Sequence, residues 1–322
     1  MTDVLRIHQY ASLHPGPRLI VLGGVHGDEL CGTQGIQRIA DDLDQGVVSL
    51  QCGQLTLVPV ANPLARQQLQ RAGERNLNRS FRPVDAPIDY EARITNRLCP
   101  LLAAHDVLLD LHSFQSAGDA FAMIGPRDNQ GALEPFQRAF EEGLLALHLG
   151  TSRVVEGWLD IYAAGIAQRG QPLTETALAY GWGTNEYMRS QGGYAVTLEC
   201  GQHHDPAAPV VAHGAILSAL RLLGMVEGAL PVLDSPRLLR LVATTDRHAL
   251  GDRFVRDWAS FDPVLQGQVI GLREDGSPLA APGDGYIVFP NAQAALGTEW
   301  YYFAVDSDRQ LQAPEASTAP LR

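Results

Sequence analysis

A histidine and a glutamate lie three residues apart in the segment 23–29, which reads GGVHGDE. His26 and Glu29 are residue types that bind transition metals through an imidazole nitrogen or a carboxylate oxygen. The segment follows the apolar run 19–22, which is typical of a buried parallel strand. Open α/β sheets bind ligands beyond the carboxyl ends of their strands. His26 and Glu29 are therefore candidate metal ligands, although a His-x-x-Glu spacing alone is also common on polar surfaces.

A second histidine, His112, comes directly after another apolar run, 106–111. Together with His26 and Glu29 it would complete three protein ligands with an open fourth position, the usual arrangement of a catalytic zinc site. Asp110, two residues earlier, is a candidate to orient a ligating imidazole from behind. The alternative is an ordinary histidine at the end of a strand.

An acid, Glu199, ends a further apolar run, 194–199. A carboxylate beside a metal-bound water can take its proton and later pass that proton to a leaving amine. Glu199 is therefore a candidate general base and acid. The alternative is an acid that caps a loop or a helix.

The segment 61–90 is polar and irregular, and loops of that length tend to be functional. It carries a cluster of basic and amide side chains, namely Arg71, Arg75, Asn76, Asn78 and Arg79. The planar fork of an arginine suits bidentate capture of a carboxylate. The cluster is thus a candidate substrate clamp, and a solvated polar loop is the alternative.

The elements that position these residues alternate between strands and helices, which predicts an α/β fold with a mostly parallel sheet flanked by helices. Strands are expected at 18–24, 54–60, 106–111, 120–124, 152–155 and 194–199. Helices are expected at 33–44, 91–102, 133–147 and, opened by an Asp205-Pro206 cap, as far as 223, with two more between 159 and 191.

After Pro231 the composition changes to short apolar runs separated by Gly, Pro and Asp, which is typical of a small all-β unit. The predicted organisation is an α/β metal-binding domain over 1–231, a small C-terminal all-β domain over 232–306 and a disordered polar tail over 307–322.

The bulk composition excludes several classes of protein. The 322 residues carry a net charge of −12, which argues against a general nucleic-acid or anionic-membrane surface. No apolar stretch approaches the length of a membrane span, and the first residues lack the apolar core of a signal peptide. The 4 cysteines are not paired in CxxC motifs, so we expect reduced core thiols and a cytoplasmic protein.

Taken together, five short segments resemble the succinylglutamate desuccinylase/aspartoacylase family, a branch related to zinc carboxypeptidases. They are GGVHGDE (23–29), ANP (61–63), NLNRSF (76–81), DLHS (110–113) and TLECG (197–201). Each motif is modest, but the ordered set on the expected elements is specific and spans most of residues 18–204. The resemblance implies a carboxypeptidase-like α/β fold that binds one Zn2+ per chain.

The resemblance also implies a role for each matching residue. His26, Glu29 and His112 would be the metal ligands, and Glu199 would be the general base and acid. Arg71 would be catalytic and polarise the scissile carbonyl, with Arg75 competing for that role. Asn78 and Arg79 would hold the α-carboxylate of the released amino acid, and Arg189 would grip an acyl-side carboxylate.

Two features depart from the family pattern or add to it. The family contributes an active-site tyrosine from its second domain, and Tyr286, Tyr301 and Tyr302 are all candidates here. His203 and His204 are extra, and either line the pocket or cap the following helix.

The implied activity is zinc-dependent hydrolysis of the amide bond of an N-acylated amino acid or related amine. Its partner would be a small molecule rather than a nucleic acid or a membrane, and the family's tendency to pair suggests a homodimer. Two alternatives stay open. One is a zinc carboxypeptidase that acts on a peptide or a cell-wall fragment, and the other is a non-catalytic ligand-binding zinc protein.

Overall fold

The computed structural model describes residues 4–230 and 235–311. Within these ranges, none of the helices has the length and apolar character needed to cross a bilayer.

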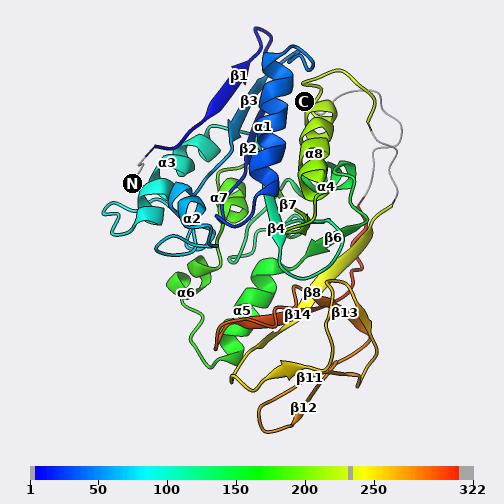
Figure 1. Ribbon diagram of the computed structural model, residues 1–322. Coiled ribbons are helices and arrows are strands. Elements are labelled where there is room, and N and C mark those ends of the chain that lie inside the picture. The colour runs from blue at the N-terminus through cyan, green and yellow to red at the C-terminus, as the bar shows by residue number, and fades with distance from the viewer. Residues whose placement is uncertain (1–3, 231–234, 312–322) are drawn as a thin grey trace.

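A mixed sheet of 11 strands runs through the molecule in the order β1-β3-β2-β4-β7-β5-β6-β8-β14-β13-β10 (Figure 1). Its central strands β3, β2, β4 and β7 are parallel neighbours. The strands up to residue 202 are β1 (His8–Ala11), β2 (Arg18–Leu22), β3 (Gln54–Val58), β4 (Val107–Phe114), β5 (Phe121–Met123), β6 (Arg153–Glu156) and β7 (Tyr194–Gln202).

Helices cover both faces of these central strands. The helices of the described residues are α1 (Cys31–Asp44), α2 (Pro63–Gln68), α3 (Tyr90–Ala103), α4 (Ala139–His148), α5 (Trp158–Gln168), α6 (Glu175–Tyr180), α7 (Thr184–Ser190) and α8 (Ala208–Leu222), of which α5 and α6 lie away from these strands. α1 and α8 lie side by side on one face (Figure 1). The prediction of an α/β fold with a large sheet flanked by helices is confirmed.

From Leu19 to Leu22 the strand β2 is hydrophobic at every position rather than at alternating ones, because both of its faces are buried. Leu19 and Val21 pack in the core that contains α1 and α8. Ile20 and Leu22 point to the opposite face and pack in the core that contains α3 and α7. Both faces of the strand are buried, which is the usual state of a parallel strand in an α/β sheet.

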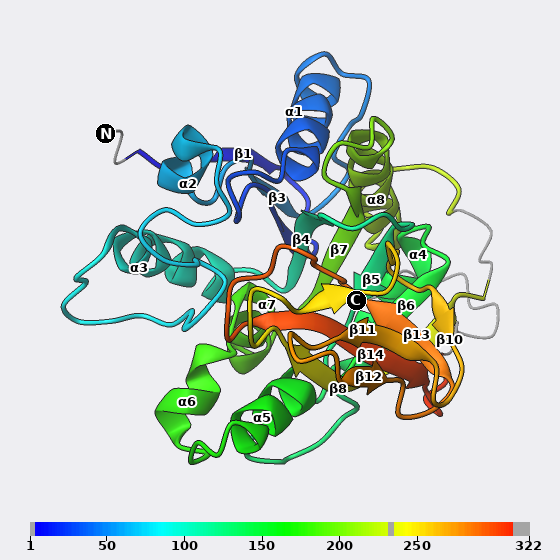
Figure 2. The ribbon, with the colours of Figure 1, turned by 60° about the horizontal axis from the view of Figure 1, so that its bottom comes forward.

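The C-terminal strands continue the main sheet, because β8 pairs with β6 in parallel. They are β8 (Arg237–Asp246), β9 (Arg253–Phe254), β10 (Pro263–Val264), β11 (Val269–Leu272), β12 (Pro278–Ala280), β13 (Gly285–Val288) and β14 (Glu299–Asp306). β12, β11 and β9 form a separate antiparallel sheet of 3 strands. α5 lies along β8 and connects the two parts of the fold (Figure 2).

Some predicted boundaries were wrong. The helix expected over 133–147 begins at Ala139, since the preceding segment forms an isolated bridge between Asn129 and Phe136. Asp205 does not cap α8, which begins at Ala208; its side chain instead accepts a hydrogen bond from the N–H of Ala207. Three helices, α5, α6 and α7, replace the two expected between 159 and 191.

The predicted domain boundaries stay predictions. The division between 231 and 232 lies outside the described residues, as does the 312–322 part of the predicted tail. The first residues of that tail, 307–311, are described, and Arg309 is buried there with its guanidinium donating to the carbonyl of Gly125 and to Glu156.

Candidate active site

The turn after β2 is shaped by glycine so that its histidine and glutamate face the sheet edge. Gly24 has a φ of 57°, in the left-handed region that favours glycine. A Cβ on Gly27 would lie 2.0 Å from the carbonyl carbon of Ala65 in α2, so only glycine allows this approach. These two positions explain the spacing of glycines around His26.

His26, Glu29 and His112 converge at this turn. Their metal-binding atoms all lie within 4.8 Å of one another, and all three side chains are buried. The Glu29 carboxylate bridges the two rings, with Oε1 at 2.7 Å from Nδ1 of His26 and Oε2 at 2.8 Å from Nδ1 of His112. The structure thus brings together the three predicted ligands, with one correction of detail: His112 lies within β4, which extends to Phe114, rather than beyond its end.

Neighbouring groups orient both imidazoles from behind. The Nε2–H of His26 donates to Oδ1 of Asn76 at 3.1 Å, which leaves Nδ1 as the lone-pair nitrogen. Oδ2 of Asp110 lies 3.0 Å from Nε2 of His112, a charge contact without the direction of a hydrogen bond. Thr184 donates its hydroxyl to the same carboxylate.

These residues fit a divalent metal ion. The two Nδ1 atoms lie only 3.2 Å apart and share one carboxylate, so their lone pairs point toward a common position. Two imidazoles and a carboxylate are a donor set that zinc accepts in catalytic sites. Supporting groups such as Asn76 and Asp110 behind the ligands are also typical of metal sites.

The side chain of Glu199 lines the same cavity as His26 and His112. Its residue is 8% exposed and its Oε2 has no hydrogen-bond partner among the described residues. Burial raises the pKa of Glu199 to about 8. The positive charge of His112 lowers this pKa, and the negative charge of Glu29 raises it. A carboxyl group whose pKa lies near the working pH can both accept and return a proton.

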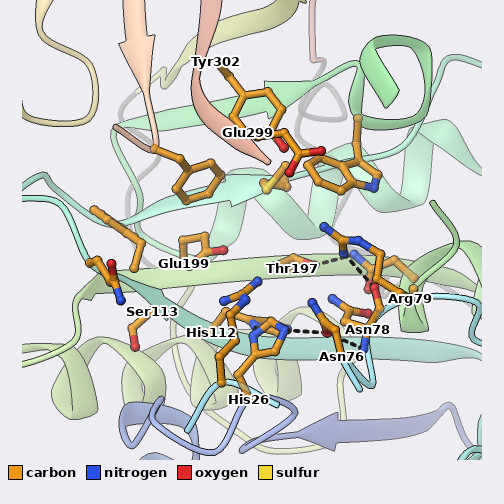
Figure 3. Close-up of a pocket in the computed structure, with 18 of the residues that line it drawn as sticks. His26, Asn76, Asn78, Arg79, His112, Ser113, Thr197, Glu199, Glu299 and Tyr302 are labelled. Atoms are coloured by element: carbon orange, nitrogen blue, oxygen red, sulfur yellow. Dashed lines mark hydrogen bonds between the residues drawn. The ribbon is translucent and has the colours of Figure 1, made fainter. Parts of the chain in front are cut away.

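This cavity of about 480 Å³ lies over these groups. Figure 3 shows His26 and His112 on one side, Glu299 and Tyr302 on the other, and Glu199 between them. Other residues that line the cavity include Arg71, Asn76, Asn78, Arg79, Ser113, Trp158, Thr184, Arg189, Thr197, His203 and Phe289.

Arg71 reaches the ligand set from the long loop. Its NH1 lies 3.0 Å from Oε1 of Glu29, and 53% of its side chain is exposed. The guanidinium is therefore beside the candidate metal position and still has donors free for a substrate oxygen.

Asn78 and Arg79 also face the cavity. The Oδ1 of Asn78 accepts a hydrogen bond from the N–H of Thr184 at 3.0 Å, so its amide nitrogen is the end that can donate. Arg79 lies over the ring of Trp158, 5.1 Å from the ring centroid, and donates through NH1 to the carbonyl of Asn78. Figure 3 shows both residues on the same side of the cavity. Two donor groups side by side suit a carboxylate.

Arg75 does not line the cavity. Its Nε lies 3.0 Å from Oδ2 of Asp89, and its NH1 donates to the carbonyls of Asn76 and Arg79. The guanidinium therefore holds the loop in shape. The expectation that Arg75 competes with Arg71 for the substrate carbonyl is not supported by this placement.

Arg189 lines the cavity, but its guanidinium forms ion pairs with acidic neighbours. It lies 2.6 Å from Glu134, 2.8 Å from Glu142 and 3.4 Å from Glu186, and NH2 donates to the carbonyl of Ala195. The side chain is 3% exposed. With its charge offset by three acids, Arg189 is a poor partner for a substrate carboxylate, and we leave it out of the substrate-binding set.

The structure places three further residues, Tyr302, His203 and Asn76, whose position in the site the sequence did not reveal. Tyr302 lines the cavity, whereas Tyr286 and Tyr301 do not. His203 also lines it and forms a 2.8 Å hydrogen bond between Nδ1 and Oγ of Ser113. Asn76 orients His26, a role that its place in the NLNRSF motif did not reveal.

Comparison with known proteins points to one family. Residues 15–157 match the model of the succinylglutamate desuccinylase/aspartoacylase catalytic domain. The chain therefore resembles this family over fewer than half of its 322 residues. The matched range includes all three candidate metal ligands and the loop that carries Arg71, Asn78 and Arg79.

Two curated relatives of this chain are named as deacylases. It is 28% identical over 287 residues to the succinylglutamate desuccinylase of Burkholderia thailandensis, covering 87% of this chain and 77% of the relative. It is 26% identical over 269 residues to the N-alpha-acetyl-L-2,4-diaminobutyric acid deacetylase of Halomonas elongata, covering 79% of this chain and 70% of the relative.

Solved structures of the family share its fold. A succinylglutamate desuccinylase/aspartoacylase from Rhodobacter sphaeroides superposes with a TM-score of 0.72 at 18% identity, covering 94% of this chain and 90% of the other. The product-bound ectoine utilization protein EutE (DoeB) from Ruegeria pomeroyi gives a TM-score of 0.67 at 20% identity, covering 93% and 88%.

Proposed function

We propose that the protein is a metal-dependent hydrolase that cleaves the amide bond of an N-acylated amino acid to a carboxylate and a free amine. The observation that carries the proposal is the convergence of His26, Glu29 and His112 with Glu199 in one cavity. The names of the curated relatives, which are deacylases of N-acyl amino acids, support the same reaction class.

His26, Glu29 and His112 would hold one Zn2+ per chain. When bound, the metal would supply Lewis acidity that polarises a carbonyl and makes water a better nucleophile near neutral pH. Ser113 helps to fix the ligands, because its N–H donates to Oε2 of Glu29 at 3.2 Å.

Glu199 would move the proton. As general base it would take a proton from the attacking water at its buried, unpartnered Oε2, and as general acid it would return that proton to the leaving nitrogen. Arg71 would donate to the carbonyl oxygen as negative charge develops there, which is usually the largest electrostatic contribution in such reactions.

Asn78 and Arg79 would position the substrate. The amide nitrogen of Asn78 and the free donors of Arg79 would bind the α-carboxylate of the amino acid. Holding that end fixes the distance of the amide bond from Glu199, which is a contribution of orientation rather than of chemistry.

The test is release of free amine from a set of N-acetyl-L-amino acids, compared with glycyl dipeptides of the same amino acids. Glu199→Gln serves as the control for contaminating hydrolases. The proposal expects the N-acetyl compounds to be cleaved by the wild type and not measurably by the variant. Cleavage of the dipeptides alone would instead identify a carboxypeptidase, and cleavage of neither set would contradict hydrolysis of these amides.

A further inference from the structure

The wall of the cavity opposite the candidate metal ligands carries an acid, Glu299. It opens β14, and three residues later the same strand contributes Tyr302 to the cavity (Figure 3). In a regular strand, residues three apart point to opposite faces. Here the register between β14 and β8 shifts between Glu299 and Tyr301, and this irregularity allows Glu299 and Tyr302 to share one face.

The charge of Glu299 is only loosely paired. Its Oε1 lies 3.4 Å from NH2 of Arg169, but that arginine is held more closely by Asp246, at 2.7 and 2.9 Å. Among the described residues no hydrogen bond reaches Oε2 of Glu299, and 29% of the side chain is exposed. Arg169 is thus shared by two carboxylates, and the further cations that act on this wall are Arg79 and Arg71.

Aromatic side chains line the same cavity as this acid. The ring of Tyr302 lies 5.9 Å from that of Trp158 and 6.3 Å from that of Phe289, measured between centroids, and all three residues line the cavity. The negative charge of Glu299 also contributes to raising the pKa of the buried Tyr302, mainly a consequence of burial, which places the two groups close together. A carboxylate among aromatic faces is a favourable environment for a cation.

Two of the three arginines that line the cavity already have an acidic partner, and Arg71 is also assigned to the substrate carbonyl in the proposed reaction. Of these arginines, Arg189 is offset by three acids, and Arg71 lies against Glu29. Arg79 is the arginine that remains for the α-carboxylate of the substrate. A substrate with another negative charge would meet Glu299 instead.

We infer that Glu299 binds a positively charged ammonium group on the side chain of the substrate's amino acid. The inference rests on the proposed function and narrows its substrate to N-acyl amino acids with one carboxylate and a cationic side chain. Glu299 is then a specificity-determining residue that acts on binding of the side chain and not on the amide bond.

The experiment compares kcat/KM for three probes of similar length: Nα-acetyl-L-ornithine (cationic), Nα-acetyl-L-norvaline (neutral) and Nα-acetyl-L-glutamate (acidic). Each is measured with wild type, Glu299→Gln and the matched control Asp257→Asn, an exposed acid outside the cavity. The wild type should prefer the cationic probe to the neutral one by about 10- to 100-fold, the range expected for a charge-assisted contact.

Glu299→Gln should remove that preference while changing the neutral probe by less than about threefold, and Asp257→Asn should change neither. Equal losses on the cationic and neutral probes would show that Glu299 only supports the fold, and a wild-type preference for the acidic probe would also overturn the inference. The wild-type ranking stands as a test even if the variant does not fold. Hydrolysis of none of the probes would instead count against the proposed function itself.

Discussion

His112 on β4 and Glu199 on β7 are register partners on neighbouring parallel strands. Side chains of directly paired residues project to the same face of a sheet, so the backbone ladder places the Glu199 carboxyl beside a candidate metal ligand. β4 is buried along its whole length, which makes this relationship a property of the rigid core rather than of a loop. Sites on such elements hold their geometry closely.

Replacing Glu199 with glutamine should separate proton transfer from binding. The amide is nearly isosteric but cannot accept a proton from water, so kcat should fall by about 10²–10⁴ while KM changes little. The check is steady-state kinetics on an N-acetyl amino acid that the wild type cleaves. Metal content should equal that of the wild type, and a variant with full turnover would exclude Glu199 as the base.

Arg79→Met should weaken substrate binding. Loss of a charge-assisted contact to the α-carboxylate is expected to lower kcat/KM by about 10- to 100-fold. The effect should disappear for the corresponding α-carboxamide substrates, which carry no carboxylate. Arg82→Met, an exposed arginine on the same loop, is the control. A loss of the same size on the carboxamides would mean that Arg79 acts on the fold of the loop.

Arg189→Met should destabilise the protein rather than change its specificity. Removing the guanidinium leaves Glu134, Glu142 and Glu186 close together without their cation. Breaking a buried ion pair from one side costs about 3–5 kcal/mol in the free energy of unfolding. Urea unfolding measures this cost. The variant could instead be as stable as the wild type and lose activity only on substrates with an acidic acyl group. That result would show that Arg189 binds the substrate.

Asp252 should make the C-terminal part of the protein sensitive to acid. Burial favours its neutral form, but the N–H groups of His248, Ala249 and Glu274 and the guanidinium of Arg273 outweigh burial and lower the pKa to about 2. A carboxyl whose pKa is depressed on folding stabilises the protein above its ordinary pKa of about 4, and this contribution is lost as the pH falls toward 2.

The corresponding variant is Asp252→Asn. At pH 7 it should lower the free energy of unfolding by about 2 kcal/mol, the scale of hydrogen bonds to a charged group. Its stability should then fall less than that of the wild type between pH 4 and pH 2. Parallel acid-induced losses in the two proteins, followed by tryptophan fluorescence, would contradict the assignment.

The placement of His26, Glu29 and His112 could be predicted because strand ends are visible in the sequence. Apolar runs mark buried parallel strands, and polar residues in or just after their carboxyl-terminal parts gather at one sheet edge. The three ligands therefore come together although residues 29 and 112 are far apart in the chain. The same reasoning placed Glu199 beside them.

Other parts of the site depended on contacts that no local pattern reveals. Arg79 and Arg189 are the same residue type, but only the packing of Glu134 and Glu142 shows that Arg189 is already paired. Glu299 could not be predicted at all. It reaches the cavity through a register shift in β14, and a shift of one residue changes which face a side chain occupies.

The most direct test of the account is the metal content of purified wild-type protein, measured by elemental analysis beside His112→Ala and the control His14→Ala, an exposed histidine outside the cavity. We expect one zinc per chain in the wild type and in His14→Ala, and a loss of zinc in His112→Ala. Folded wild-type protein that contains no metal and takes up none when zinc is added would contradict this expectation.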